Sequence, residues 1–281
     1  MNTPLLARRT GLTSTGLALV VATFTVAAFA KDAKQDTPRM KDGKPDLNGV
    51  WINDGMSFLN PQRDANGSVL CIVGCPSAKP ANADGAPAAP RPARMPPSRP
   101  KYKAEFEGKV KELSEKQVAL DPALKCGNPG VPRIGPPDQI VQQAGQVVFL
   151  YEDLSGSFFR VIPTDGRPHR KDAEETFLGD SVGHWEGDTL VVEAVKFTDE
   201  TWLTDNGAFH TNGLKVTERI RRVGDKLEYQ AIADDPNVLA EPWQLRARTL
   251  KQSDEPLPEP LPCVEMDLDH VVDGTHHDNA R

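Results

Sequence analysis

Short apolar segments alternate with tight, glycine-containing turns between residues 139 and 252, and this regularity constrains the fold more than any other feature. Two such segments on either side of a short turn are typical of a β-hairpin. The turns fall at residues 144–145, 187–188 and 224–225, and the last segment, 243–252, predicts one further strand. Consecutive hairpins of this kind predict an antiparallel meander over residues 139–252.

An open meander would expose backbone groups along both of its edges. The segment "PDLNGVWIND" (45–54) predicts an early strand, and closure into a small barrel would remove those edges. Residues 76–100 contain eight prolines and cannot join a sheet, so they predict an extended, mobile insertion. Residues 101–117 predict a charged surface helix. The expected fold class is therefore all-β, an antiparallel β-barrel with a Pro-rich insertion and one helix.

Two sets of segments resemble known families. "LNGVW" (47–51) is similar to the Gly-x-Trp strand that opens lipocalin-type barrels, in which the tryptophan closes the barrel floor. From about residue 121 to 266, segments such as "TFLGDSVGHWEGDTLVVE" and "LKVTERIRRV" resemble a widespread family of exported bacterial proteins with a lipocalin-like domain. The resemblance implies a lipocalin-like barrel and export, and it implies no particular activity. The chain departs from the family at its end, which reads "CVEMDLDHVVDGTHH".

The first thirty residues predict a signal peptide. Arg8-Arg9 precedes an uncharged stretch that ends in the small-x-small triplet at 28–30, so cleavage is expected after Ala30. The mature chain would begin near Lys31 and form a single domain over residues 31–281. The paired arginines leave both the general and the twin-arginine export routes open. We expect a periplasmic or secreted protein with no stable membrane insertion after cleavage.

Four cysteines in an exported chain predict two disulfides. Cys71 and Cys75 can close a local loop, while Cys126 and Cys263 would pair over a long span and pin the C-terminal segment to the main domain. A zinc site built on "CIVGC" is the alternative, but no second cysteine pair lies nearby. The chain carries a formal net charge of −7 and has no basic stripe, which excludes nucleic acid as a partner.

Strand alternation predicts which polar side chains point inward. Glu218 shares a strand face with Val216 and Ile220, and the opposite face of that strand is cationic. The same alternation places three other polar residues on faces with apolar neighbours: Arg160, His184 and Tyr229. A buried carboxylate without a partner is costly, so Glu218 should meet these side chains. The group predicts either an acid–base site or a structural network that fixes strand register.

A second set of candidates lies in connections between strands, where ligands of a barrel enter. The loop "PTDGRPHRKD" (163–172) is the most conspicuous, although an ordinary solvent loop is the competing interpretation. The substrate-binding candidates are Arg167, His169, Asp180, Trp202 and His210. Three histidines, 169, 184 and 210, could hold a metal, but their spacing matches no metal motif, so no metal is predicted.

No Gly-x-Ser-x-Gly elbow, phosphate loop or dinucleotide fingerprint is present, and we expect no cofactor. The predicted function is a lyase or isomerase, of the decarboxylation or dehydration type, that acts on a small aromatic or apolar molecule in the barrel. Glu218, His184 and Tyr229 would transfer protons, and Arg160 would hold a carboxylate or a developing oxyanion. The alternatives are a carrier of a hydrophobic ligand and a metal-assisted hydrolase that uses the three histidines. The pairing of Glu218 discriminates among them.

Overall fold

The computed structural model describes residues 36–53, 62–63, 69–71, 99–153, 155–258 and 263. These residues all belong to one compact unit, Gln35–Arg281. The predicted signal peptide (1–30), nearly all of the Pro-rich insertion and Cys75 of the predicted Cys71–Cys75 disulfide lie outside the described residues.

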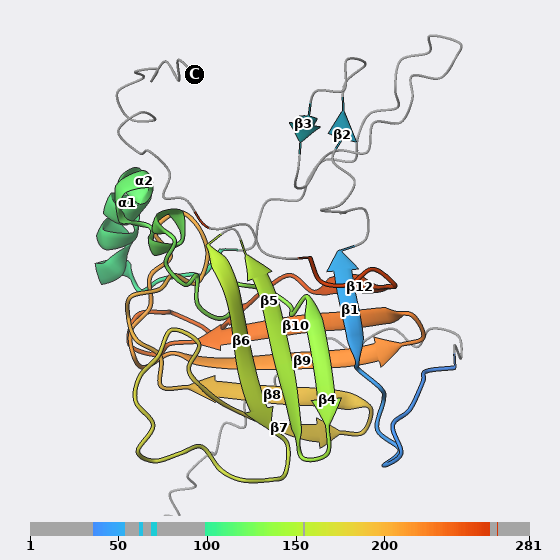
Figure 1. Cartoon of the computed structure of the whole chain (residues 1–281). Coiled ribbons are helices and arrows are strands. Elements are labelled where there is room, and N and C mark those ends of the chain that lie inside the picture. Colours follow the sequence, from blue (N-terminus) through green and yellow to red (C-terminus); the bar gives the residue numbers. More distant parts are fainter. Residues whose placement is uncertain are drawn as a thin grey trace, which may run out of the picture. The chain divides into compact units, whose positions relative to one another are not determined.

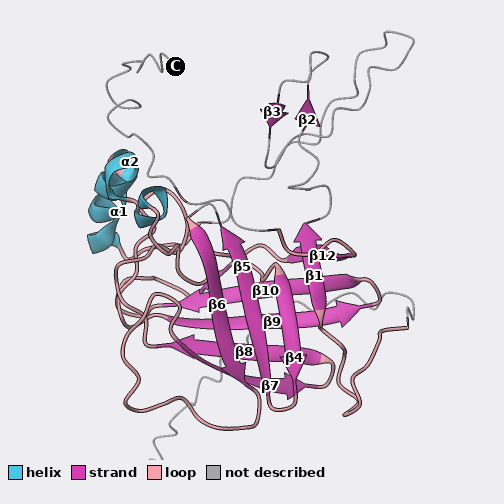
Figure 2. Ribbon diagram, viewed as in Figure 1, coloured by secondary structure: helices cyan, strands magenta, loops and turns pink. Residues whose placement is uncertain are grey.

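A continuous path of antiparallel strands forms the wall of a nearly closed barrel (Figures 1 and 2). In spatial order the strands are β6 (Gly156–Pro163), β5 (Gln146–Asp153), β4 (Gln139–Gln143), β1 (Gly49–Asn53), β12 (Arg248–Ser253), β10 (Lys226–Asp234), β9 (Lys215–Val223), β8 (Thr189–Val195) and β7 (Asp180–Glu186). In addition, β11 (Trp243–Gln244) pairs with β10, and β2 (Gln62–Arg63) pairs with β3 (Val69–Cys71). Figure 1 shows β4, β5 and β6 crossing in front of β7 to β10. The predicted all-β antiparallel barrel is confirmed.

The three predicted hairpin turns are confirmed as the connections β4–β5, β7–β8 and β9–β10. Their glycines, at positions 145, 187 and 224, have φ values of 78°, 60° and 61°, a region in which a side chain is costly. The segment 243–252, predicted as one strand, contains two. Its pairing with β10 shifts by one residue between Ile232↔Gln244 and Tyr229↔Arg248, and this shift interrupts the ladder.

The barrel closes where β6 faces β7, and we call this junction the seam. Every step of the path from β6 to β7 is antiparallel and the number of steps is even, so the two end strands run in the same direction. Side chains join them: Arg160 Nη2 donates to Ser181 Oγ at 2.9 Å. Two residues further along each strand, a Cβ on Gly183 would lie 3.2 Å from Ile162 Cγ2. The seam is therefore held by side-chain contacts, and no strand pairing between β6 and β7 is present in the described sheet.

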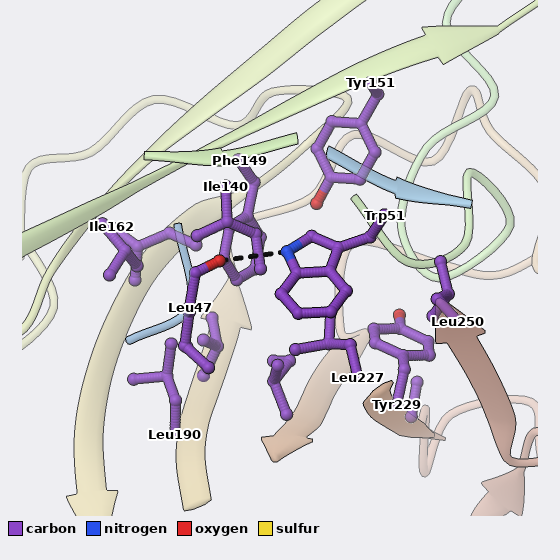
Figure 3. Close-up of a cluster of buried hydrophobic side chains, with 14 residues drawn as sticks. Leu47, Trp51, Ile140, Phe149, Tyr151, Ile162, Leu190, Leu227, Tyr229 and Leu250 are labelled. Atoms are coloured by element: carbon purple, nitrogen blue, oxygen red, sulfur yellow. Dashed lines mark hydrogen bonds between the residues drawn. The ribbon is translucent and has the colours of Figure 1, made fainter. Parts of the chain in front are cut away.

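The interior of the barrel is filled by apolar side chains from both halves of the wall (Figure 3). Trp51 from β1 is fully buried, and its Nε1 donates to the Leu47 carbonyl at 3.0 Å. The guanidinium of Arg222 lies 5.1 Å from the centre of the Trp51 ring and donates to the Asp46 carbonyl at 2.6 Å. These contacts fix the segment that enters β1 against the core, and the cation adds an attractive interaction with the indole face.

The predicted helix at 101–117 is made of three pieces: η1 (Ala104–Phe106), α1 (Glu107–Glu115) and α2 (Gln117–Leu120). No residue of α1 is buried, which confirms that the helix lies on the surface. It covers a second apolar cluster, against which Phe106, Val110 and Leu113 pack. In the described part of the chain, none of the helices combines the length and apolar character needed to cross a membrane.

The predicted pairing of Cys126 with Cys263 is also confirmed. Cys126 follows the short helix η2 (Pro122–Lys125), whose N-cap Asp121 is fully buried and accepts two hydrogen bonds from Arg133. The disulfide, with a Cα–Cα distance of 5.7 Å, therefore ties residue 263 to a firmly held connection that leads into β4.

Candidate functional site

Three of the four predicted catalytic residues meet inside the barrel. Glu218 on β9 has no exposed surface. Its Oε2 accepts a hydrogen bond from Arg160 Nη1 at 2.6 Å, and its Oε1 accepts one from the Tyr229 hydroxyl at 3.0 Å. Alternation along β6, β9 and β10 turns these side chains inward, as the sequence predicts. The small residue Ala231 lies directly opposite Glu218 in the β9–β10 ladder.

Two further residues complete this group, which we call the Arg160 network: Arg160, Glu218, Tyr229, Tyr151 and Ser181. Arg160 Nη1 also donates to the Tyr151 hydroxyl at 3.0 Å, and Nη2 donates to Ser181 across the seam. Sequence reasoning missed both partners. The alternation of β5 could have identified Tyr151, whereas Ser181 becomes a partner only because β7 approaches β6 in space. Arg160 Nε is buried and has no hydrogen-bond partner among the described residues.

Burial governs the protonation of the network. Burial raises the pKa of the Tyr151 and Tyr229 phenols, so both hydroxyls stay protonated and available as donors. Burial alone would lower the pKa of Arg160, but the Glu218 carboxylate beside it raises that pKa above its ordinary value. The network therefore holds a guanidinium against a carboxylate inside the apolar core. Both oxygens of Glu218 are engaged and neither reaches solvent, an arrangement typical of a structural ion pair.

The predicted position of His184 is wrong. Its side chain is half exposed on the outside of β7, where Nε2 lies 3.3 Å from Glu186 Oε1. The sequence placed Val182, His184 and Glu186 on one face correctly, but that face is the outer one. The inner face of β7 carries Gly183 and Trp185 instead, since Gly183 is buried and the Trp185 side chain packs against the core cluster. His184 therefore does not reach Glu218, and the proton-transfer group inferred from the sequence lacks its histidine.

A groove of about 570 Å³ runs along the outside of the seam, and we call it the seam groove. One side is formed by β6, and the other by the loop before β7 and the start of β7. Its apolar lining includes Phe159, Val161 and Phe177, which are among the most exposed large apolar residues described; Phe159 is 67% exposed. Arg160 and Ser181 also line the groove, so the buried network reaches its floor. Alternation along β6 turns Arg160 and Ile162 inward and so places Phe159 and Val161 on the outer face, but it gives no reason to expect Phe177 in the same groove.

Two of the five predicted substrate-binding residues, Arg167 and Asp180, line the seam groove. Asp180 Oδ2 lies 3.1 Å from His169 Nδ1, and Oδ1 accepts from Arg170 Nε at 2.8 Å. Burial would raise the pKa of Asp180, but the hydrogen bonds from Arg170 and His169 hold it below its ordinary value. Arg167 pairs with the neighbouring Asp165 in solvent. The rim of the groove therefore carries two exposed guanidinium groups, from Arg167 and Arg170.

The remaining three predicted substrate-binding residues, His169, Trp202 and His210, are not in the groove lining. His169 contacts Asp180, whereas Trp202 and His210 are buried in the protein. Trp202 belongs to the second apolar cluster. His210 Nδ1 lies 2.9 Å from the Thr211 carbonyl and Nε2 lies 2.7 Å from the Thr201 hydroxyl, so the ring donates to Thr211 and accepts from Thr201. Burial lowers the pKa of His210, consistent with a neutral ring that has a structural role.

Histidines 169, 184 and 210 each contact a different partner: Asp180, Glu186 and Thr201. Within the ranges that the structure describes, no group of three His, Cys, Asp or Glu side chains is placed to hold a metal ion. The three histidines therefore do not converge on one site, as a metal-assisted hydrolase would require.

The site therefore consists of a buried ion-pair network whose arginine reaches the floor of an apolar groove with a cationic rim. The family resemblance over residues 121–266 stays a prediction. The assignment of a barrel fold depends only on the observed strand pairing. Comparison with protein-family models, curated proteins and solved structures gives no match for this chain.

Proposed function

We propose that this protein is an exported binding protein for a small aromatic or apolar molecule that carries an anionic group, held in the seam groove. The observation that carries the proposal is the concentration of exposed Phe159, Val161 and Phe177 around one concave site. Large apolar side chains gathered in this way mark interaction surfaces, and a volume of this size suits a small molecule.

The cations around the groove favour an anionic ligand. Arg167 and Arg170 have side chains that are 60% and 69% exposed, and their ion pairs with Asp165 and Asp180 leave most of each guanidinium in solvent. Exposed ion pairs of this kind contribute only about 0–1 kcal/mol, so a ligand carboxylate can join or replace them at little cost. Arg160 adds a third guanidinium at the floor of the groove, and its Nε has no hydrogen-bond partner in the part of the chain that the structure describes.

The geometry supports binding better than the proton-transfer chemistry expected from the sequence. A catalytic acid or base must come within hydrogen-bond reach of its substrate. Glu218 has no exposed surface and is separated from the groove by Arg160, while His184 lies on the outer face of β7. Proton transfer by Glu218 would require β6 and β7 to separate.

Fluorescence titration with two probes tests the proposal: anionic anilinonaphthalene sulfonate and neutral N-phenylnaphthylamine. Phe159→Ser should weaken binding of the sulfonate about tenfold, because it removes a large part of the apolar wall. The matched control is Leu120→Ser, which removes another exposed apolar side chain (45% exposed) from α2, outside the groove lining. The double variant Arg167→Gln/Arg170→Gln should weaken the sulfonate more than the neutral probe. Equal binding by the wild type and Phe159→Ser would refute the assignment of the site.

A further inference from the structure

We propose that the seam groove takes an aromatic monocarboxylate, and that Arg170 binds its carboxylate through the free Nη1 and Nη2 edge of the guanidinium. The inference rests on the binding function proposed above, and it names the ligand class and the residue that selects it. It follows from a difference between the two exposed guanidinium groups at the rim of the groove.

Arg167 and Arg170 both line the groove, but each has a different edge of its guanidinium engaged. Arg167 Nε donates to both oxygens of Asp165, at 2.9 and 3.0 Å, and Arg167 Nη2 donates to Oδ2. Arg170 uses Nε alone, which donates to Asp180 Oδ1 at 2.8 Å. Among the residues that the structure describes, Nη1 and Nη2 of Arg170 have no hydrogen-bond partner. Arg170 therefore offers two terminal nitrogens, side by side, to a ligand.

Asp180 holds Arg170 in place for this contact. The Asp180 side chain is 8% exposed at the start of β7, and its Oδ2 accepts from the backbone N–H of Arg170 at 3.1 Å. The same oxygen lies 3.1 Å from His169 Nδ1. Arg170 is thus fixed to β7 at its backbone and at Nε, although most of its side chain is in solvent. A guanidinium held in this way loses less conformational entropy when a ligand binds.

The free edge of Arg170 matches a carboxylate. Its two parallel N–H donors can pair with the two oxygens of a planar carboxylate, and such charge-assisted hydrogen bonds are stronger than neutral ones. The charge balance of the groove favours a monoanion. The three guanidinium groups in the lining, from Arg160, Arg167 and Arg170, each have a carboxylate partner already. A monocarboxylate adds one negative charge to this balanced set, whereas a phosphate dianion would add two.

The apolar part of the ligand would lie against β6 and the loop that follows it. Phe159 and Val161 line the groove from the outer face of β6, and Phe177 lies in the same connection between β6 and β7 as Arg170. Aromatic side chains favour an aromatic partner, because ring contacts add to the burial of apolar surface. The lining therefore places an aromatic surface and a free cationic fork around one groove.

Displacement of neutral N-phenylnaphthylamine by two matched compounds tests the proposal. Naphthalene-2-carboxylate and naphthalene-2-carboxamide differ in charge but hardly in shape. The wild type should bind the carboxylate about tenfold more tightly than the carboxamide. Arg170→Gln should reduce this ratio to less than about threefold and leave carboxamide binding unchanged. The matched control is Lys171→Gln, which removes the same charge from the next residue, outside the groove lining, and should leave the ratio unchanged.

Two further variants examine the edge of the guanidinium. Arg170→Lys keeps the charge without the fork and should recover only part of the ratio. Arg167→Gln should lower the ratio less than Arg170→Gln does, because the Nε and Nη2 edge of Arg167 is already engaged by Asp165. Complete recovery in Arg170→Lys, or an equal loss in the two glutamine variants, would overturn the proposal. Tighter binding of 2-naphthyl phosphate than of the carboxylate would overturn it as well.

The neutral probe separates this proposal from the function proposed above. If N-phenylnaphthylamine binds the wild type and Phe159→Ser equally, the groove is not the ligand site and both proposals fail. If Phe159→Ser weakens the probe but the carboxylate and the carboxamide displace it equally, the groove is a ligand site and only the carboxylate assignment fails.

Discussion

The substitution Glu218→Gln probes the physical role of the buried Arg160 network. Glutamine keeps the size of the side chain and one acceptor oxygen but removes the charge. Arg160, whose side chain is 3% exposed, would then be a buried cation without a counter-ion. Breaking a buried ion pair on one side costs about 3–5 kcal/mol. For a domain of this size, that loss lowers the melting temperature by roughly 10 °C.

Replacing both charges should cost less than replacing one. Arg160→Met combined with Glu218→Leu removes the uncompensated cation along with the carboxylate, so the remaining penalty is that of two phenols without their partners. The double-mutant cycle consists of Arg160→Met, Glu218→Leu and the variant with both changes. Its coupling energy should be about 2 kcal/mol or more in favour of the pair. A coupling energy near zero would mean that the two side chains do not act as a pair in solution.

Urea unfolding followed by circular dichroism measures these differences. Glu193→Gln is the matched control, because Glu193 is exposed on β8, next to the residue that pairs with Glu218. Its free energy of unfolding should change by no more than about 0.5 kcal/mol. A loss below about 1 kcal/mol in Glu218→Gln would refute the argument that burial makes this ion pair indispensable.

Three other predictions concern the buried carboxyl of Asp138, the disulfide and the exposed His184. Burial raises the pKa of Asp138 from 3.8 to about 6, so protonated Asp138 stabilises the fold below pH 4, and this contribution is lost as pH rises through 6. Asp138→Asn should remove about 2 kcal/mol of that pH dependence in urea titrations between pH 4 and 7. Cys126→Ser with Cys263→Ser opens a loop of 137 residues and should lower the free energy of unfolding by up to about 5 kcal/mol, in comparison with the oxidised wild type. His184→Ala should leave probe binding unchanged and alter the free energy of unfolding by no more than about 0.5 kcal/mol, because the side chain faces solvent. A larger loss of stability or of probe binding would show that His184 contributes to the core or to the groove.

Local pattern was enough to predict the strands and the inward carboxylate. The hairpins turn at glycines whose conformations favour that residue, and the apolar neighbours of Glu218 on β9 identify its face without reference to any other strand. The predicted position of His184 is wrong for a related reason. The spacing groups His184 correctly with Val182 and Glu186, but the choice between faces depends on Gly183, which carries no hydrophobic signal, and on Trp185, whose side chain packs against the core cluster.

The seam groove could not be predicted because it depends on which strands become neighbours in space. Alternation on β6 puts Phe159 and Val161 on the outer face of the barrel, but nothing in the sequence indicates that Phe177, from the loop before β7, lines the same groove. They meet only because β6 and β7 are the two ends of the strand path. Ser181 likewise becomes a partner of Arg160 only through that approach.

The common direction of β6 and β7 has a consequence for what the barrel can accept. Two ends that run the same way cannot complete an antiparallel ring with one another, whatever their side chains. A single additional strand that runs opposite to both would pair with each in antiparallel fashion and turn an odd set into an even one. The wall would therefore need one more strand before antiparallel backbone hydrogen bonds alone could close it.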